Sequence, residues 1–158
     1  MKFQATRQLP ISTRGAAKSE LRTQFAALCF RIRKERPDIL LVTSRGSGRW
    51  IVPKGWPQHE MTPADSALRE AWEEAGVRGQ AIDRCLGLYS YAKTEEGGRA
   101  LPCLAMLYPI FVRDLADDYP EAGERQRSWM RPKKAARLVE EPELAHLIRN
   151  FDPKLLRP

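Results

Sequence analysis

The chain has 158 residues, of which 42% are hydrophobic and 30% charged, and its formal net charge is +7. These proportions are typical of one soluble globular domain and exclude an intrinsically disordered chain. No apolar run approaches the roughly 18 residues of a membrane-spanning helix, and the first residues lack the apolar segment of a secretory signal. We therefore expect a cytoplasmic protein without a membrane partner.

The positive charge favours an anionic partner. A polyphosphorylated small molecule fits best, because the basic residues lack the interleaved aromatic residues of a nucleic-acid platform; nucleic acid remains the weaker alternative. Three widely spaced cysteines in apolar stretches predict free thiols. The oligomeric state is left open.

The first segment, residues 1–22, is polar and basic and is interrupted by proline and glycine, which predicts an N-terminal arm. It precedes a predicted domain over residues 23–152, followed by a tail over residues 153–158. Within the domain, apolar runs predict strands over residues 24–33, 39–44 and 50–52, with a turn rich in glycine and serine before the third strand.

A helix is predicted next from its boundaries. Thr62 can cap its first turn, Pro63 suits the first helical position because no donor is needed there, and Gly76 ends it. One side of this helix carries a stripe of apolar residues that we expect to face the core. The stripe consists of Ala64, Ala67, Leu68, Ala71, Trp72 and Ala75.

The other side of the helix carries Glu70, Glu73 and Glu74, at spacings that place all three on one face, away from the apolar stripe. Their like charges repel, so a cation is expected beside them. A solvated acidic face is the alternative, although such faces usually mix signs, and only Arg69 stands at the edge of this one. The spacing alone leaves both interpretations open.

Two longer strands follow over residues 82–93 and 101–113, joined by a Glu-Glu-Gly-Gly turn, and residues 127–130 form a further short strand. Helices are predicted over residues 132–139 and 142–151, each opening with proline. Strands interspersed with one helix and followed by two more predict an α/β fold, an α/β/α sandwich around a mixed β-sheet.

The spacing from Gly55 to Val77 resembles the Nudix box, whose family pattern is G-x5-E-x7-R-E-U-x-E-E-x-G-U, with U an apolar residue. The matching positions are Gly55, Arg69, Glu70, Ala71, Glu73, Glu74, Gly76 and Val77. Met61 stands where the family has its first glutamate. In the family that glutamate is chiefly a structural partner of the box arginine, so the departure bears on local order more than on chemistry.

This resemblance implies the Nudix fold and a hydrolase that cleaves a pyrophosphate bond. It also implies that Glu70, Glu73 and Glu74 ligate Mg²⁺ or Mn²⁺ and that Arg69 orients a glutamate. Independently, carboxylate oxygens suit a hard divalent cation that shares its remaining sites with water and phosphate. Such an ion neutralises phosphate oxygens and lowers the pKa of a bound water.

The general base is either a box glutamate or an acid from a loop. Among the loop acids, Glu124 ranks first because its loop lies between two predicted strands and could reach the box. The other candidates are Glu121, Glu95 and Glu96, and ordinary loop charges are the alternative for each.

The resemblance is closest to diphosphoinositol polyphosphate phosphohydrolases and diadenosine polyphosphate hydrolases. Residues 44–55 and 125–130 resemble their approach to the box and their strand before the terminal helices. This implies a diphosphoinositol polyphosphate or a dinucleoside polyphosphate as substrate. An RNA 5′-pyrophosphohydrolase and a non-catalytic ligand-binding domain are the alternatives.

The predicted substrate-binding residues are Arg45, Arg49, Lys54 and Gly55. Arginine binds phosphate through paired hydrogen bonds and lysine binds it as a point charge, whereas solvated surface cations are the alternative. Trp56 is suited either to stacking on a base or sugar or to packing. Tyr89 and Tyr91 are suited either to the core or to a pocket wall.

Overall fold

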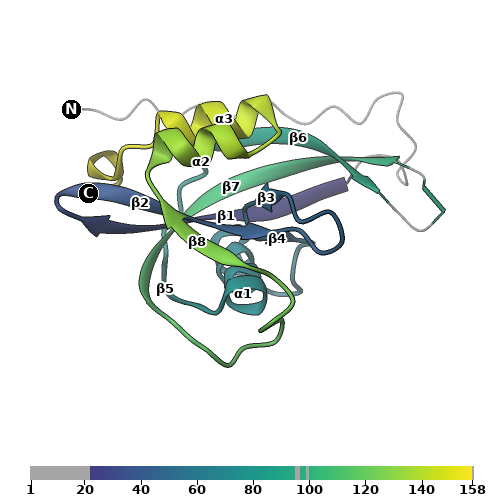
Figure 1. The fold of residues 1–158 in the computed structure, drawn as a ribbon, viewed down its shortest axis with the longest axis horizontal. Coiled ribbons are helices and arrows are strands. Elements are labelled where there is room, and N and C mark those ends of the chain that lie inside the picture. Colours follow the sequence, from purple (N-terminus) through teal and green to yellow (C-terminus); the bar gives the residue numbers. More distant parts are fainter. Residues whose placement is uncertain (1–21, 95–96, 99, 158) are drawn as a thin grey trace.

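The computed structural model describes residues 22–94, 97–98 and 100–157. The predicted arm, except for Arg22, and the turn acids Glu95 and Glu96 lie outside the described residues. Figure 1 shows a central sheet with helix α1 (Pro63–Ala75) on one face and helices α2 (Pro132–Leu138) and α3 (Pro142–Arg149) on the other. The predicted α/β/α sandwich is therefore confirmed.

Within the described residues the sheet has eight strands, and it is mixed. The central strands β1 and β7 run parallel, with Phe25 opposite Met106 and Phe30 opposite Phe111. The remaining pairs are antiparallel. The strands are β1 (Arg22–Arg33), β2 (Arg36–Thr43), β3 (Trp50–Ile51), β4 (Lys54–Gly55), β5 (Val77–Ala81), β6 (Gly87–Thr94), β7 (Ala100–Leu115) and β8 (Arg127–Met130).

Helix α1 begins and ends where the local signals predict. The hydroxyl oxygen of Thr62 accepts a hydrogen bond from the backbone N–H of Asp65. Gly76 adopts a left-handed conformation with φ of 67°, and its N–H donates to the carbonyl of Trp72 at 3.0 Å. Arg127 donates to the carbonyl of Ala75 at 2.7 Å, so a β8 side chain also holds the C-terminus of the helix.

The core consists of two clusters, one on each face of the sheet. Beneath α1, the buried alanines of the helix pack on apolar residues of β1, β2 and β7. These small side chains let the helix lie close to the sheet. On the other face, the buried Leu144 and Ile148 of α3 pack with Leu28 and Leu107.

The apolar stripe of α1 faces the core as predicted, since its four alanines are buried, and two of the box glutamates are buried as well. Glu70 and Glu74 are only 8% and 6% exposed, whereas Leu68 and Trp72 are half-buried. The ring of Trp72 packs beside Tyr119 and under the guanidinium of Arg78 at the edge of the sheet. Two of the three glutamates are therefore turned into the protein, and within the apolar stripe only Leu68 and Trp72 are partly exposed.

The strand predicted over residues 82–93 is also corrected. The chain forms β5 over Val77–Ala81 and β6 over Gly87–Thr94, with an irregular segment between them. Both strands pair with the long strand β7, one after the other along its length. The intervening segment stays attached through Ile82 N–H to the Pro109 carbonyl and Leu86 N–H to the Leu107 carbonyl.

Two further elements were missed. Strand β4 has only two residues, which is too short for a periodic signal. The predicted tail contains a 3-10 helix, η1 (Pro153–Leu156), whose Leu156 packs against the core cluster under α3. Cys29, Cys85 and Cys103 form no disulfide with one another. No helix of the described residues is long and apolar enough to cross a membrane.

Gly79 tests the packing of β5 on β7. It lies at the register shift between these strands, and a Cβ there would lie 2.1 Å from the carbonyl oxygen of Phe111. We expect Gly79→Ala to lower the free energy of unfolding by about 1–3 kcal/mol, because the backbone must shift. The exposed neighbour provides the control: Gln80→Ala should change it by less than about 0.5 kcal/mol. Urea unfolding checks both, and equal stability of the two variants would contradict the packing.

Candidate active site

The carboxyl groups of Glu70 and Glu74 lie against the backbone of β4. The N–H of Lys54 donates to Glu74 Oε2 at 2.9 Å. At Gly55 a Cβ would lie 2.2 Å from Glu70 Cδ, so only glycine leaves room for this carboxylate. Strand β4 in turn pairs with the start of β1, where Gly55 is opposite Phe25. The sheet and α1 together fix both acids.

Arg125 connects this pair of acids to the rest of the site. It is almost fully buried, and its Nη2 lies 3.1 Å from Glu74 Oε1 and 3.2 Å from Glu121 Oε1. Its Nη1 also donates to the carbonyl of Thr43 at the end of β2, at 3.1 Å. Sequence reasoning missed Arg125 as a site residue. Its only signal was the family resemblance of residues 125–130, because no local spacing relates it to the helix.

Glu70 and Glu73 have partners of their own, one in the box loop and one in the helix. Gln58 Nε2 donates to Glu70 Oε1 at 3.2 Å, and the backbone N–H of Gln58 donates to Ser66. Arg69, which was expected to orient a glutamate, donates from Nε to Glu73 Oε1 at 3.0 Å across one helical turn. Glu73 is more exposed than Glu70 and Glu74. Gln58 of the box loop therefore holds Glu70, and Arg69 of the helix holds Glu73.

Burial changes the protonation of the acidic face. Burial, and then the charge of Glu73, raise the pKa of Glu70, against a hydrogen bond from Gln58. Burial raises the pKa of Glu74 to about 7, although Arg125 and the N–H of Lys54 act in the opposite direction. The positive charge around these carboxylates therefore compensates only part of their desolvation.

The three predicted metal ligands do not converge in this structure. Their principal partners differ, as Gln58 holds Glu70, Arg69 holds Glu73 and Arg125 holds Glu74. In the described part of the chain, no group of three His, Cys, Asp or Glu side chains is arranged to hold an ion. The donor chemistry fits, since carboxylate oxygens are the ligands that a hard divalent cation prefers. The Mg²⁺ or Mn²⁺ ligand set stays a prediction.

The structure places Glu121, and not Glu124, beside the box. The N–H of Glu121 donates to the carbonyl of Glu73 at 3.0 Å, and the charge of Glu121 raises the pKa of Glu70. Glu124 is about half exposed and pairs with Arg45 at 3.6 Å. The turn closed by the hydrogen bond from Glu124 N–H to the Glu121 carbonyl directs the two side chains differently. The ranking of Glu124 as first candidate therefore has no structural support.

Two of the predicted phosphate-binding residues, Arg45 and Arg49, pair with acids in different parts of the protein. Arg45 lies by the loop and pairs with Glu121 and Glu124. Arg49 pairs with Glu141 at 2.8 Å and more weakly with Glu140, both at the junction of α2 and α3.

Lys54 has a different kind of partner. Its ammonium lies 4.7 Å from the centre of the Tyr91 ring, and burial lowers its pKa. The charge of Arg49 lowers this pKa further, so Arg49 and Lys54 share one environment. Gly55 serves to admit the Glu70 carboxylate, as described above.

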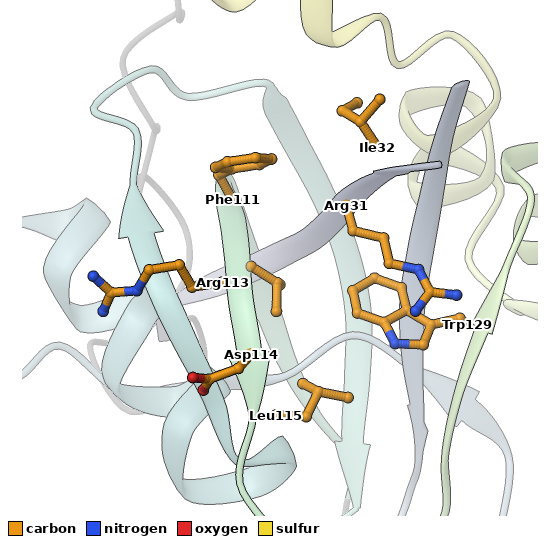
Figure 2. Close-up of a pocket in the computed structure, with 8 residues that line it drawn as sticks. Arg31, Ile32, Phe111, Arg113, Asp114, Leu115 and Trp129 are labelled. Atoms are coloured by element: carbon orange, nitrogen blue, oxygen red, sulfur yellow. The ribbon is translucent and has the colours of Figure 1, made fainter. Parts of the chain in front are cut away.

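A separate hollow of about 480 Å³ lies at the far ends of β1 and β7. Figure 2 shows Phe111 and Ile32 at one end of it and the Arg31 guanidinium over the Trp129 ring, 4.4 Å from its centre. None of the predicted site residues lines it. Arg31 is six residues along β1 from Phe25, about 20 Å at the rise of a strand, so this hollow is not the box site.

Comparison with known proteins bears on the family and the fold of the chain. The model of the NUDIX domain matches residues 22–151. Human diphosphoinositol polyphosphate phosphohydrolase 3-beta is 30% identical over 133 residues, which cover 83% of this chain and 77% of that protein. Diphosphoinositol polyphosphate phosphohydrolase 2 of Mus musculus is 29% identical over 83% of this chain and 70% of its own length.

Two solved structures share the fold. The Ap4A hydrolase of C. elegans superposes with a TM-score of 0.59 at 18% identity, covering 85% of this chain and 98% of its own. The MutT protein of Methanosarcina mazei Go1 also has a TM-score of 0.59, at 20% identity, over 90% of this chain and 100% of its own. The chain belongs to the Nudix family. The prediction of a Nudix hydrolase acting on phosphoanhydride bonds is confirmed at this level.

The contact between Gly55 and Glu70 can be tested by a double-mutant cycle. We expect Gly55→Ala to lower the free energy of unfolding by about 1–3 kcal/mol, because the new methyl displaces the buried carboxylate. In a Glu70→Ala background the same substitution should change it by less than about 0.5 kcal/mol. Urea unfolding of the four proteins checks this, and equal effects in both backgrounds would show that the two residues do not meet.

The raised pKa of Glu74 predicts a pH dependence of stability. The folded protein holds this proton up to about pH 7, whereas an ordinary glutamate releases it near 4.5. The stabilisation is therefore present below pH 4.5 and is lost as the pH rises through 7. In EDTA, we expect the wild type to lose about 1–3 kcal/mol relative to Glu74→Gln between about pH 5 and pH 8. Urea titrations at both pH values measure it, and a constant or growing difference would contradict it.

Proposed function

We propose that this chain is an Mg²⁺- or Mn²⁺-dependent pyrophosphohydrolase that cleaves a phosphoanhydride bond in a polyphosphorylated small molecule. The substrate classes are diphosphoinositol polyphosphates and dinucleoside polyphosphates. The observation that carries the proposal is the Nudix box on α1, whose Glu70 and Glu74 are buried against β4. The names of the similar proteins support both substrate classes.

The metal would be held by Glu70, Glu73 and Glu74, once Glu73 is released by Arg69 and Glu74 by Arg125. When bound, the ion neutralises phosphate oxygens and activates a water for attack. Arg125 would then remain paired with Glu121 at the edge of the site. This exchange of partners keeps each carboxylate next to a positive charge.

The remaining roles belong to groups around the acidic face. Lys54 directly precedes Gly55 of the box and would bind a substrate phosphate as a point charge. Arg45 and Arg49 would exchange a carboxylate for a phosphate when substrate binds. Either a box glutamate or Glu121 would accept the proton of the attacking water, and Glu121 is the loop acid in reach of α1.

Two alternative functions are each favoured by one observation. An RNA 5′-pyrophosphohydrolase keeps the same chemistry and is favoured by the net charge of +7. Steeply salt-dependent binding of oligonucleotides would support it. A non-catalytic ligand-binding domain is favoured by Met61 in the altered box position. Substantial turnover by the wild type would exclude it.

The acid at the centre of the box gives the direct test. We expect Glu73→Gln to lower the Mg²⁺-dependent release of phosphate or nucleotide at least about hundredfold, because the loss of a metal ligand removes several kcal/mol of transition-state stabilisation. Glu60→Gln is the matched control, since Glu60 is exposed and its ion pair is with His59, outside the acidic face. Full activity of Glu73→Gln would refute the proposed site.

A further inference from the structure

The central sheet divides at the end of β1 that is remote from the box. The parallel pairing of β1 with β7 ends at Phe30 opposite Phe111. Beyond this pair, β1 continues with β2 as far as Arg33, and β7 continues with β5 as far as Leu115. The hollow of about 480 Å³ is lined by residues 31–32 of β1 and 111–115 of β7, so it lies where the two strands separate (Figure 2).

Flat side-chain groups line this hollow in two places. The Arg31 guanidinium lies over the Trp129 ring, 4.4 Å from its centre, and Figure 2 shows the pair on one side of the hollow. Phe111 lies at another side and is 38% exposed, although its ring also contacts that of Phe30. Aromatic rings and guanidinium planes are the groups on which unpaired bases stack. The hollow therefore offers two stacking positions.

Arginines beside the hollow outnumber the acid that they share. Asp38 is only 2% exposed, and three guanidinium groups surround it. Its carboxylate oxygens lie 3.0 Å from Arg31, 3.4 Å from Arg33 and 3.1 Å from Arg131. One carboxylate neutralises one of these charges, so the cluster keeps an excess of positive charge at the edge of the hollow.

Arg113 adds a further charge, and a β-bulge sets its position. Arg78 is opposite Asp114 and Gly79 is opposite Val112, so Arg113 is the extra residue of β7, and a bulge redirects such a side chain. Arg113 is exposed, and no carboxylate of the described residues lies within 4.0 Å of its guanidinium. Asp114, which also lines the hollow, is paired with Arg78 at 3.7 Å. A phosphate is thus a suitable partner for Arg113.

A second hollow of about 470 Å³ continues the surface on the other side of Arg113. Arg113 lines it together with Leu68 and Trp72 of α1. Here the Arg78 guanidinium lies 5.4 Å from the centre of the Trp72 ring. Arginine over tryptophan therefore recurs on both sides of Arg113. The fold thus brings together the interleaved basic and aromatic groups that are absent from the linear sequence.

We propose that the surface formed by Arg31, Phe111, Arg113 and Trp129, called the arginine–aromatic cleft below, binds single-stranded nucleic acid as a ligand. Phosphates pair with Arg113 and with the arginines around Asp38, and bases stack on the Phe111 ring and the Arg31 guanidinium. A duplex keeps its base faces covered, and an acidic peptide engages the charges alone. The cleft lies away from the box, so this inference does not depend on the proposed function.

Fluorescence anisotropy of a labelled single-stranded RNA of about 12 nucleotides tests the cleft on the full chain. The RNA carries a 5′-hydroxyl and the buffer contains EDTA, so the box has neither a pyrophosphate nor a metal to bind. We expect a Kd in the micromolar range at about 50 mM salt, and binding of a duplex of the same sequence at least about tenfold weaker. No binding of the single strand, or equal binding of the duplex, would overturn the proposal.

Substitutions in the cleft locate the bound strand. We expect Arg113→Gln to weaken binding about threefold to tenfold and to lower the slope of log K against log salt by about 0.7, the value of one phosphate contact. Phe111→Leu keeps apolar bulk without a ring and should weaken binding about tenfold, whereas Phe111→Tyr should stay within about threefold of the wild type. Lys134→Gln, at an exposed lysine on α2, is the charge-matched control and should leave binding unchanged. Wild-type binding by both Arg113→Gln and Phe111→Leu would place the strand elsewhere and contradict the proposal.

Competition with polyglutamate separates nucleic acid from an acidic protein as the partner. We expect polyglutamate of similar length to displace the labelled RNA at least about tenfold less effectively than unlabelled RNA does, because it supplies charge without bases. Equal displacement by the two polymers would assign the cleft to an acidic protein segment and refute the inference, with the proposed hydrolase unaffected.

Discussion

The burial of two like charges on adjacent turns of α1 is the constraint on which this site depends. A buried carboxylate requires hydrogen bonds or opposite charge, and Glu70 and Glu74 obtain them from different sources. Gly55 leaves space for one carboxylate, and the N–H of Lys54 binds the other. Arg125 then ties Glu74 to the end of β2 and to the loop acid Glu121. The positions of β4, the loop and the helix all follow from these contacts.

Met61, at the altered position of the box, leaves Arg69 without the glutamate that the family pattern has there. Met61 is 38% exposed and supplies no charge to Arg69. Arg69 pairs instead with Glu73, one turn further along the helix. A predicted metal ligand therefore has a cationic partner of its own.

The distribution of charge distinguishes this site from a general anion-binding surface. The net charge of +7 suggests free cations, yet the arginines near the box are paired with acids. Paired arginines bind phosphate only by giving up a carboxylate, whereas Lys54 and Lys93 lie over rings. The overall charge therefore acts mainly through long-range attraction of an anion.

The sequence by itself determined the elements whose signals are local. Thr62, Pro63 and Gly76 bound α1 because caps act within a few residues, and the Nudix spacing identified Gly55 and the box glutamates. The division of residues 77–94 into β5 and β6 could not be read, because it depends on how both strands share β7. Nor could the different positions of Glu121 and Glu124, because these depend on a single turn between them.

Only the tertiary structure decided which charges meet. Arg49 reaches Glu141 across 92 residues of sequence, and Arg125 reaches the Thr43 carbonyl across 82. Periodicity gives the face of a helix or strand, but it carries no information about which distant face lies opposite. The sequence predicted that the apolar stripe of α1 faces the core, but not that Glu70 and Glu74 are buried as well. The alanines of the helix pack on the sheet, and their small side chains bring the helix backbone close to β4.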